Sequence, residues 1–276
     1  RMKIEIQEII NQLLHTKGTD ISIFEEDFLI KTIDKRLLAT DNNSYKDYCR
    51  YLIANESETD LLFKSFHISF SEFFRNPLTF AVLEQIILPS FLEKKKIRKE
   101  KDIRIWSAAC ASGQESYSLA ILFDELIETT NSKIACRIFA TDISPSELSN
   151  ASRGVYQTLS VNKVSLQRIK KYFTKKGDSH TISQNLRKYI DFSVFDLLTE
   201  HGDSPPASIF GNFDVIFCSN ILFYYKPEFR LRILEKMSKN LSTGGFLITG
   251  EAEREIVKSF KFREVFPNSA VFQKEK

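Results

Sequence analysis

The chain has 276 residues, 42% of them hydrophobic, which is enough for a large core and for one or two domains. Lysine and arginine (39) nearly balance aspartate and glutamate (36), so the net charge of +3 gives no reason to expect a nucleic-acid partner. The four cysteines have no C-x-x-C spacing, which disfavours a zinc site and a disulfide scaffold and indicates a reduced, cytoplasmic protein with no metal. No apolar run approaches membrane-spanning length, so we expect no membrane insertion.

The first sixty residues have helical periodicity throughout. Gly18 is placed to stop the first helix, a second helix is expected at about Phe24–Ala39, and Ser44 is placed to cap a third. This predicts an all-helical N-terminal domain at residues 1–72, joined to a larger domain at 73–276.

The next segment, Ser69 to Arg75, precedes a strongly apolar helix that is expected at Leu78–Leu92, with Pro77 at its start. A segment in this position is able to fold over a bound cofactor.

The stretch from Asp102 to Leu126 is the centre of the chain. Ile103, Ile105 and Trp106 indicate a strand that ends in small residues, and helical spacing follows beyond Gly113. A strand, a small-residue turn and a helix N-terminus predict a site for a nucleotide-like ligand.

The turn departs from the dinucleotide fingerprint. Its glycine positions hold Ala109, Ala111 and Gly113, so only the last keeps the freedom of glycine for positive φ and close backbone approach. A diphosphate is therefore disfavoured, whereas an adenosine that carries a sulfonium amino acid needs only a smooth shelf. This predicts S-adenosylmethionine.

Asp142 ends the next strand, 29 residues after Gly113. A carboxylate at a strand end is suited to accept both ribose hydroxyls. The alternative is that Asp142 caps the helix that starts at Ser144. We favour the ligand role because of the loop that precedes it.

An excursion then interrupts the α/β alternation at about residues 168–194. Tyr172-Phe173, Thr181-Ile182 and Tyr189–Val194 flank a polar turn at Lys176-Gly177-Asp178. This pattern predicts a small inserted antiparallel ribbon, after which Phe192 to Leu197 resumes the main sheet.

The remainder continues the alternation. Phe213 to Phe217 indicates a buried strand, Asn220 begins the turn after it, and a helix is expected at Pro227–Leu241. We therefore expect an α/β fold with a doubly wound sheet, to which the helical domain and the ribbon are additions.

Four motifs in order carry a resemblance: FFRN at Phe73–Asn76, RIWSAACASGQESYSLA at Arg104–Ala120, FATDIS at Phe139–Ser144 and FCSNILFYY at Phe217–Tyr225. Together they resemble the chemotaxis receptor methyltransferases (CheR type), which esterify glutamate side chains with S-adenosylmethionine and release S-adenosylhomocysteine. The resemblance covers nearly the whole chain and implies a class I methyltransferase fold.

The resemblance also implies site residues. Arg75 and Tyr224 would orient the substrate carboxylate. The chain departs from the family pattern at five positions: Ser69 stands for Asn, Ser71 for Thr, Gln114 for Glu, Asp196 for Asn and Ser219 for Arg. The predicted cofactor-binding set is Ser69, Ser71, Arg75, Ala109, Gly113, Glu115, Asp142, Asp196, Leu197, Asn220 and Ile221.

As in that family, the partners would be the cytoplasmic helices of chemotaxis receptors, and we expect a monomer. The helical domain, with a basic edge of Lys31, Lys35 and Arg36, and the ribbon are the expected docking surfaces. For the basic edge, a solvated helix face is an equally weighted alternative.

An ionised glutamate is already a nucleophile, so the reaction needs no general base. Two alternatives remain: a methyltransferase for another carboxylate substrate, and a cofactor-binding signalling adaptor with little turnover.

Overall fold

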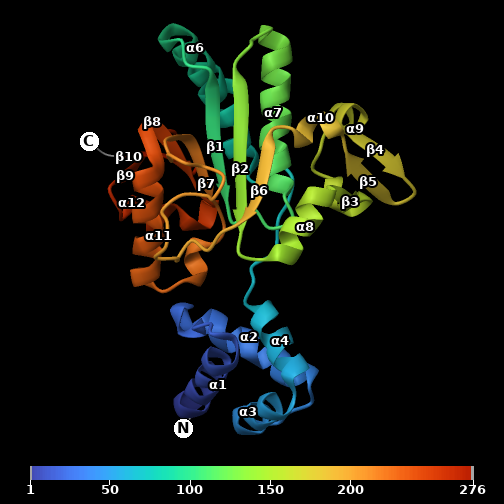
Figure 1. Cartoon of the computed structure of the whole chain (residues 1–276), viewed down its shortest axis with the longest axis vertical. Helices are drawn as coiled ribbons and strands as arrows, with labels where there is room; N and C mark the ends of the chain where they lie inside the picture. Colours follow the sequence, from blue (N-terminus) through green and yellow to red (C-terminus); the bar gives the residue numbers. More distant parts are fainter. Residues whose placement is uncertain (1, 275–276) are drawn as a thin grey trace. The chain divides into compact units, whose positions relative to one another are not determined.

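The computed structural model describes residues 2–274 and the side chains from residue 4 onward. It divides into two compact units (Figure 1). One comprises residues 2–68 and Phe223–Arg230, and the other comprises Ser69–Leu222 and residues 231–274. The helical unit thus ends close to the expected residue 72, whereas the sequence did not indicate the return of Phe223–Arg230 to it. The expected domains also include residues 1, 275 and 276, which lie outside the described residues.

The N-terminal unit is helical, as predicted. Gly18, at φ 65°, follows the first helix, and Ser44 Oγ accepts a hydrogen bond from Asp47 N (3.1 Å) at the start of the third. Its elements are α1 (Met2–Lys17), η1 (Ile21–Ile23), α2 (Glu26–Ala39), α3 (Tyr45–Ala54) and α4 (Glu56–Ser65).

Arg36 belongs to the interior of this unit rather than to a basic edge. Its Nε and Nη2 donate to both carboxylate oxygens of Glu58 (2.9 and 2.6 Å), and Tyr48 Oη donates to Glu58 Oε1 (2.7 Å). The prediction of a basic edge was wrong for Arg36 because its partner lies on another helix. Lys31 and Lys35 are exposed.

The returning segment, Phe223–Arg230, packs on the start of α2. Glu25 N donates to Tyr224 O (2.8 Å), and Arg230 Nη2 forms an ion pair with Glu25 Oε1 (2.6 Å). The ring of Tyr224 lies 4.6 Å from that of Phe28. Tyr224 is therefore part of the core of the N-terminal unit.

The larger unit is built on a seven-stranded sheet in the order β6-β2-β1-β7-β8-β10-β9. The first five strands in that order are parallel, and β10 and β9 pair antiparallel at one edge. This confirms the doubly wound fold. The strands are β1 (Asp102–Ala108), β2 (Ala135–Asp142), β6 (Ile190–Val194), β7 (Phe213–Cys218), β8 (Leu241–Ile248), β9 (Phe262–Glu264) and β10 (Val271–Lys274).

Helices pack on both faces of this sheet. Ile103 and Ile105 of β1 share one buried cluster with α6 and α7. On the other face Trp106 contacts Phe195, over whose ring Lys236 of α11 lies. The helices and short helical turns are α5 (Pro77–Val82), η2 (Leu83–Ile87), α6 (Leu88–Arg98), α7 (Gln114–Thr130), α8 (Pro145–Arg153), η4 (Leu222–Tyr224), α11 (Pro227–Asn240), η5 (Glu251–Glu253) and α12 (Arg254–Lys258).

A separate three-stranded antiparallel sheet is inserted after α8, in the order β3-β5-β4 (Figure 1). The turn at Gly177 has the predicted place, but the predicted bounds of 168–194 are wrong at both ends. Residues 190–194 form β6, which pairs with β2, because a short alternating strand fits either sheet and the pairing is non-local. The insertion comprises β3 (Val155–Gln157), η3 (Thr158–Val161), α9 (Leu166–Tyr172), β4 (Phe173–Lys176), β5 (Ser179–Ile182) and α10 (Gln184–Arg187).

Candidate active site

The candidate site lies at the carboxyl ends of β1 and β7, where the strand order reverses, which is the usual ligand position in an open α/β sheet. The loop after β1 holds three residues at positive φ: Ala109 (59°), Ala111 (47°) and Gly113 (89°). The sequence indicated the freedom for this conformation only at Gly113, whereas the two alanines adopt it as well. The left-handed conformation costs an alanine about 1–2 kcal/mol, which the surrounding contacts must offset.

Gly113 is required by packing as well as by φ. A Cβ on Gly113 would lie 2.8 Å from the Cβ of Ala151 in α8 and 3.4 Å from Tyr156 Oη. Gly113 therefore lets the cofactor loop approach α8 closely.

Asp142 fixes the same loop. Its Oδ2 accepts from Ala111 N (2.9 Å) and its Oδ1 from Ser144 N (2.9 Å). The alternative that Asp142 caps α8 is wrong, because Ser144 Oγ accepts from Glu147 N (3.3 Å) at that helix start.

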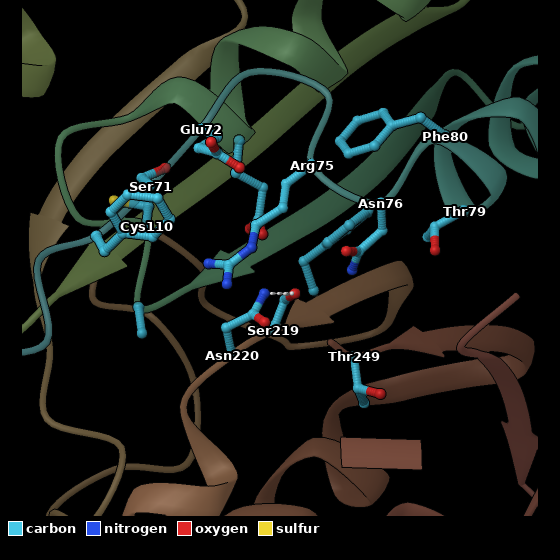
Figure 2. A pocket seen from close by; sticks show the side chains of 14 residues that line it. Ser71, Glu72, Arg75, Asn76, Thr79, Phe80, Cys110, Ser219, Asn220 and Thr249 are labelled. Carbon is cyan, nitrogen blue, oxygen red and sulfur yellow. Dashed lines mark hydrogen bonds between the residues drawn. The ribbon is translucent and has the colours of Figure 1, made fainter. Parts of the chain in front are cut away.

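A pocket opens beside this loop (Figure 2). Five of the predicted residues line it: Ser71, Arg75, Ala109, Glu115 and Asn220. The full lining is Phe70, Ser71, Glu72, Arg75, Asn76, Thr79, Phe80, Ala109, Cys110, Glu115, Phe217, Ser219, Asn220 and Thr249.

Arg75 is held by its two aromatic neighbours. Phe73 is fully buried, and Phe74 N donates to Ser118 Oγ of α7 (3.0 Å). The Arg75 guanidinium lies 5.0 Å from the centre of the Phe70 ring. Figure 2 shows it pointing toward Ser219 and Asn220.

Glu115, in the first turn of α7, brings a carboxyl group to the pocket. Its Oε1 accepts from Ser107 Oγ (2.7 Å). Burial raises the pKa of Glu115 to about 7, although the Ser107 hydrogen bond and the charge of Arg75 oppose the shift, and the charge of Glu253 adds to it.

Asn220 begins the turn after β7 in the left-handed conformation, at φ 60°. Its backbone N donates to Glu253 Oε2 (2.7 Å), and its Nδ2 donates to Ser219 Oγ (2.8 Å). Its neighbour Ile221 is buried.

The remaining predicted cofactor residues lie outside this lining. Ser69 is exposed. Asp196 follows β6 and is exposed, with its Oδ1 accepting from Leu198 N (2.8 Å), and Leu197 is buried.

Three further residues shape the site and were missed from the sequence. Ser118 anchors the segment that carries Arg75, Tyr156 Oη donates to the carbonyl of Ser112 in the cofactor loop (2.7 Å), and Glu253 holds the Asn220 turn. Only Glu253 had a usable signal, a Glu three residues after Gly250 at a strand end, as in a capping box.

Comparison with known proteins identifies the family. The model of the CheR methyltransferase SAM-binding domain matches residues 69–270. This chain belongs to the CheR methyltransferase family. A chemotaxis protein methyltransferase of Listeria innocua is 30% identical and aligns over 86% of this chain and 85% of its own length. Chemotaxis protein methyltransferase 1 of Pseudomonas aeruginosa is 37% identical over 65% and 64%, and the Vibrio anguillarum relative is 33% identical over 73% and 70%.

Membership of the CheR family confirms S-adenosylmethionine as the cofactor. The lining suits its amino-acid end, because Glu115 can offer a carboxyl to the ammonium. The cavity measures about 30 Å³, room for roughly two or three water molecules.

Within residues 2–274 no group of three His, Cys, Asp or Glu side chains is placed to hold a metal ion. None of the helices in that range combines the length and the apolar character needed to span a bilayer.

Proposed function

We propose that this chain transfers a methyl group from S-adenosylmethionine to glutamate side chains of chemotaxis receptors and so forms glutamyl methyl esters. The observation that carries the proposal is the setting of Arg75, a guanidinium in the lining of the cofactor pocket on an aromatic anchor. Among the described residues no carboxylate forms an ion pair with Arg75. Its bidentate donors are therefore available to a substrate carboxylate.

The relatives support the chemotactic role, since three of them are named chemotaxis protein methyltransferases. When bound, S-adenosylmethionine supplies an electrophilic methyl group on a sulfonium. An ionised glutamate can accept this methyl without a general base, so the task of the protein is to orient the carboxylate and to exclude water. We assign the orienting role to Arg75. The sequence also predicts Tyr224 for this role, but Tyr224 is not among the residues that line the pocket, and its ring packs against Phe28 of the helical unit; its part therefore stays a prediction that the test below decides.

Two surfaces are candidates for receptor docking. The inserted sheet has β3 and β4 at its edges, and an edge strand can accept an extended peptide as an added strand. On the helical unit, Lys31 and Lys35 of α2 are exposed and could attract acidic receptor helices.

The test is single-turnover methyl transfer to a chemotaxis receptor fragment at saturating cofactor. Arg75→Lys keeps the charge and removes the bidentate fork, so we expect the rate to fall about tenfold or more, mainly in turnover. Tyr224→Phe tests the second orienting group, and Arg263→Lys, at an exposed position, is the control. Rates equal to wild type in both variants would remove Arg75 and Tyr224 from the mechanism.

Wild-type behaviour in the same assay separates the alternatives. Cofactor binding without transfer to any receptor would favour a signalling adaptor with little turnover. Preferential methyl transfer to another carboxylate would favour the alternative of a methyltransferase whose substrate is not a receptor glutamate.

A further inference from the structure

Glu253 is a buried carboxylate that the methyl-transfer chemistry does not use. It is the last residue of η5, the short helix that follows β8, and its side chain is fully buried. Its Oε2 accepts from Asn220 N (2.7 Å) and Gly250 N (2.9 Å), and its Oε1 accepts from Leu222 N (2.6 Å). One carboxylate thus joins the loop after β7 to the loop after β8.

Every partner of this carboxylate is an N–H donor. Burial raises the pKa of Glu253, and the amides of Gly250, Asn220, Leu222 and Ile221 oppose the shift because they stabilise the ionised form. A buried carboxylate destabilises the folded state unless its charge is fully paired or hydrogen-bonded, so packing alone does not explain a glutamate at this position. Here the amides of Asn220, Ile221 and Leu222 belong to the turn that carries Asn220 into the cofactor pocket.

Gly250 restricts the same asparagine from the other side. A Cβ on Gly250 would lie 2.5 Å from Asn220 Oδ1 and 2.8 Å from its Cγ. The backbone of Gly250 is ordinary, at φ −72° and ψ 152°, so alanine would be strained by these contacts and by the backbone N of Asn220 at 3.1 Å, not by its own conformation. The Asn220 side chain therefore occupies the space that the missing Cβ leaves.

We propose that Glu253 is a positioning residue which, with Gly250, fixes Asn220 in its left-handed conformation so that the turn is ready for the cofactor. The inference rests on the assignment of Asn220 to the cofactor site. The left-handed conformation of Asn220, at φ 60°, carries a cost that the hydrogen bond from its amide to Glu253 offsets. Preorganisation of this kind raises cofactor affinity because the turn need not be ordered on binding.

The experiment measures S-adenosylhomocysteine affinity by calorimetry, well below the unfolding temperature of each variant. Glu253→Gln places an NH₂ donor among amide donors and should weaken affinity about tenfold, the equivalent of one hydrogen bond to a charged group. Gly250→Ala leaves the carboxylate intact and should weaken affinity by displacing the Asn220 side chain. Glu251→Gln, an exposed residue of the same short helix, should match wild type.

A double-mutant cycle separates positioning from a purely structural role. If Glu253 acts through Asn220, then Glu253→Gln should change affinity little once Asn220→Ala is present, although it still lowers the unfolding temperature. A full, additive effect in the Asn220→Ala background would overturn the inference, as would wild-type affinity for Glu253→Gln. If Glu253→Gln does not fold, the cycle uses Glu253→Asp, which keeps the charge but withdraws the carboxylate from the turn.

Failure of the site assignment looks different. If Asn220→Ala binds S-adenosylhomocysteine like wild type, then Asn220 does not belong to the cofactor site and nothing remains for Glu253 to position. Weakened binding in Asn220→Ala with unchanged binding in both Glu253→Gln and Gly250→Ala would overturn the positioning role alone.

Discussion

At the scale of single residues, we expect Glu115 to link cofactor binding to pH. Its raised pKa of about 7 means that much of it is protonated in the free protein near neutral pH. A cationic ammonium favours the ionised form, so cofactor binding below about pH 7 must release a proton. We expect S-adenosylmethionine affinity to rise with pH up to about 7 and then to level off. Calorimetry in buffers of different ionisation enthalpy would measure both the affinity and the released proton.

The variant Glu115→Gln should bind more weakly at pH 8 and should lose the pH dependence. The stability of the wild-type protein should change with pH in the opposite sense to its cofactor affinity. The folded-state pKa lies above the usual 4.5, so the folded state keeps its proton between about 4.5 and 7, and the stabilising effect of this proton is lost as the pH rises through that window. An unchanged pH profile of affinity in Glu115→Gln would contradict the role given to this residue.

Asp142 holds the loop after β1, and we propose that it also accepts the ribose hydroxyls; one substitution should reveal both roles. Asp142→Ala removes the hydrogen bonds to Ala111 N and Ser144 N, and it removes the proposed ribose acceptor. Each hydrogen bond to a charged group is worth about 1.5–3 kcal/mol, so both the unfolding temperature and the cofactor affinity should fall. Thermal unfolding with and without cofactor measures the two effects. A stability loss with unchanged affinity would leave Asp142 a structural role only.

At the scale of elements, the inserted sheet is connected to the cofactor site through its β3 strand. Tyr156 donates to Ser112 O (2.7 Å), and its ring packs edge-on against Phe73 at 4.9 Å. The far turn at Gly177 is open, with no atom within 4 Å of a Cβ built there. Mutations at the two ends of the small sheet should therefore affect different affinities.

Deletion of the turn around Gly177 should weaken receptor association and leave cofactor affinity intact, because the turn lies in a different element from the cofactor loop. Tyr156→Phe should instead weaken cofactor affinity severalfold, since one neutral hydrogen bond is worth about 1 kcal/mol. Parallel calorimetry with S-adenosylhomocysteine and a receptor fragment tests both. Equal losses of both affinities in the deletion variant would indicate misfolding of the sheet.

At the scale of the whole molecule, each unit has its own core, and the helical unit depends on one internal ion pair. Glu58 is buried and is held by Arg36 and Tyr48. Glu58→Gln leaves the Arg36 charge without its counter-ion, which should destabilise the helical unit by about 3 kcal/mol. Thermal unfolding compared with Glu56→Gln, an exposed neighbour, measures this loss. A transition indistinguishable from that of Glu56→Gln would contradict it.

The sequence by itself determined the class of fold, the helical N-terminal unit and the cofactor loop. These follow from local signals: hydrophobic periodicity, caps such as Ser44, and a strand that ends in the small residues before Gly113. The motifs also identified five of the residues that line the pocket. Arg75 follows two phenylalanines, Glu115 lies at the start of the helix after the small-residue turn, and Asn220 begins the turn after a buried strand.

Only the tertiary structure decided what depends on non-local pairing. It assigned residues 190–194 to the main sheet, withdrew Arg36 into an ion pair and joined Phe223–Arg230 to the helical unit. It also gave Ala109 and Ala111 the conformation that glycine would adopt, since contacts from distant residues such as Asp142 can offset about 1–2 kcal/mol of local strain. It also decided the non-local partner of Glu253: the capping-box signal concerns the nearby Gly250 N, whereas the hydrogen bond to Asn220 N, 33 residues away, follows from the folding of the chain.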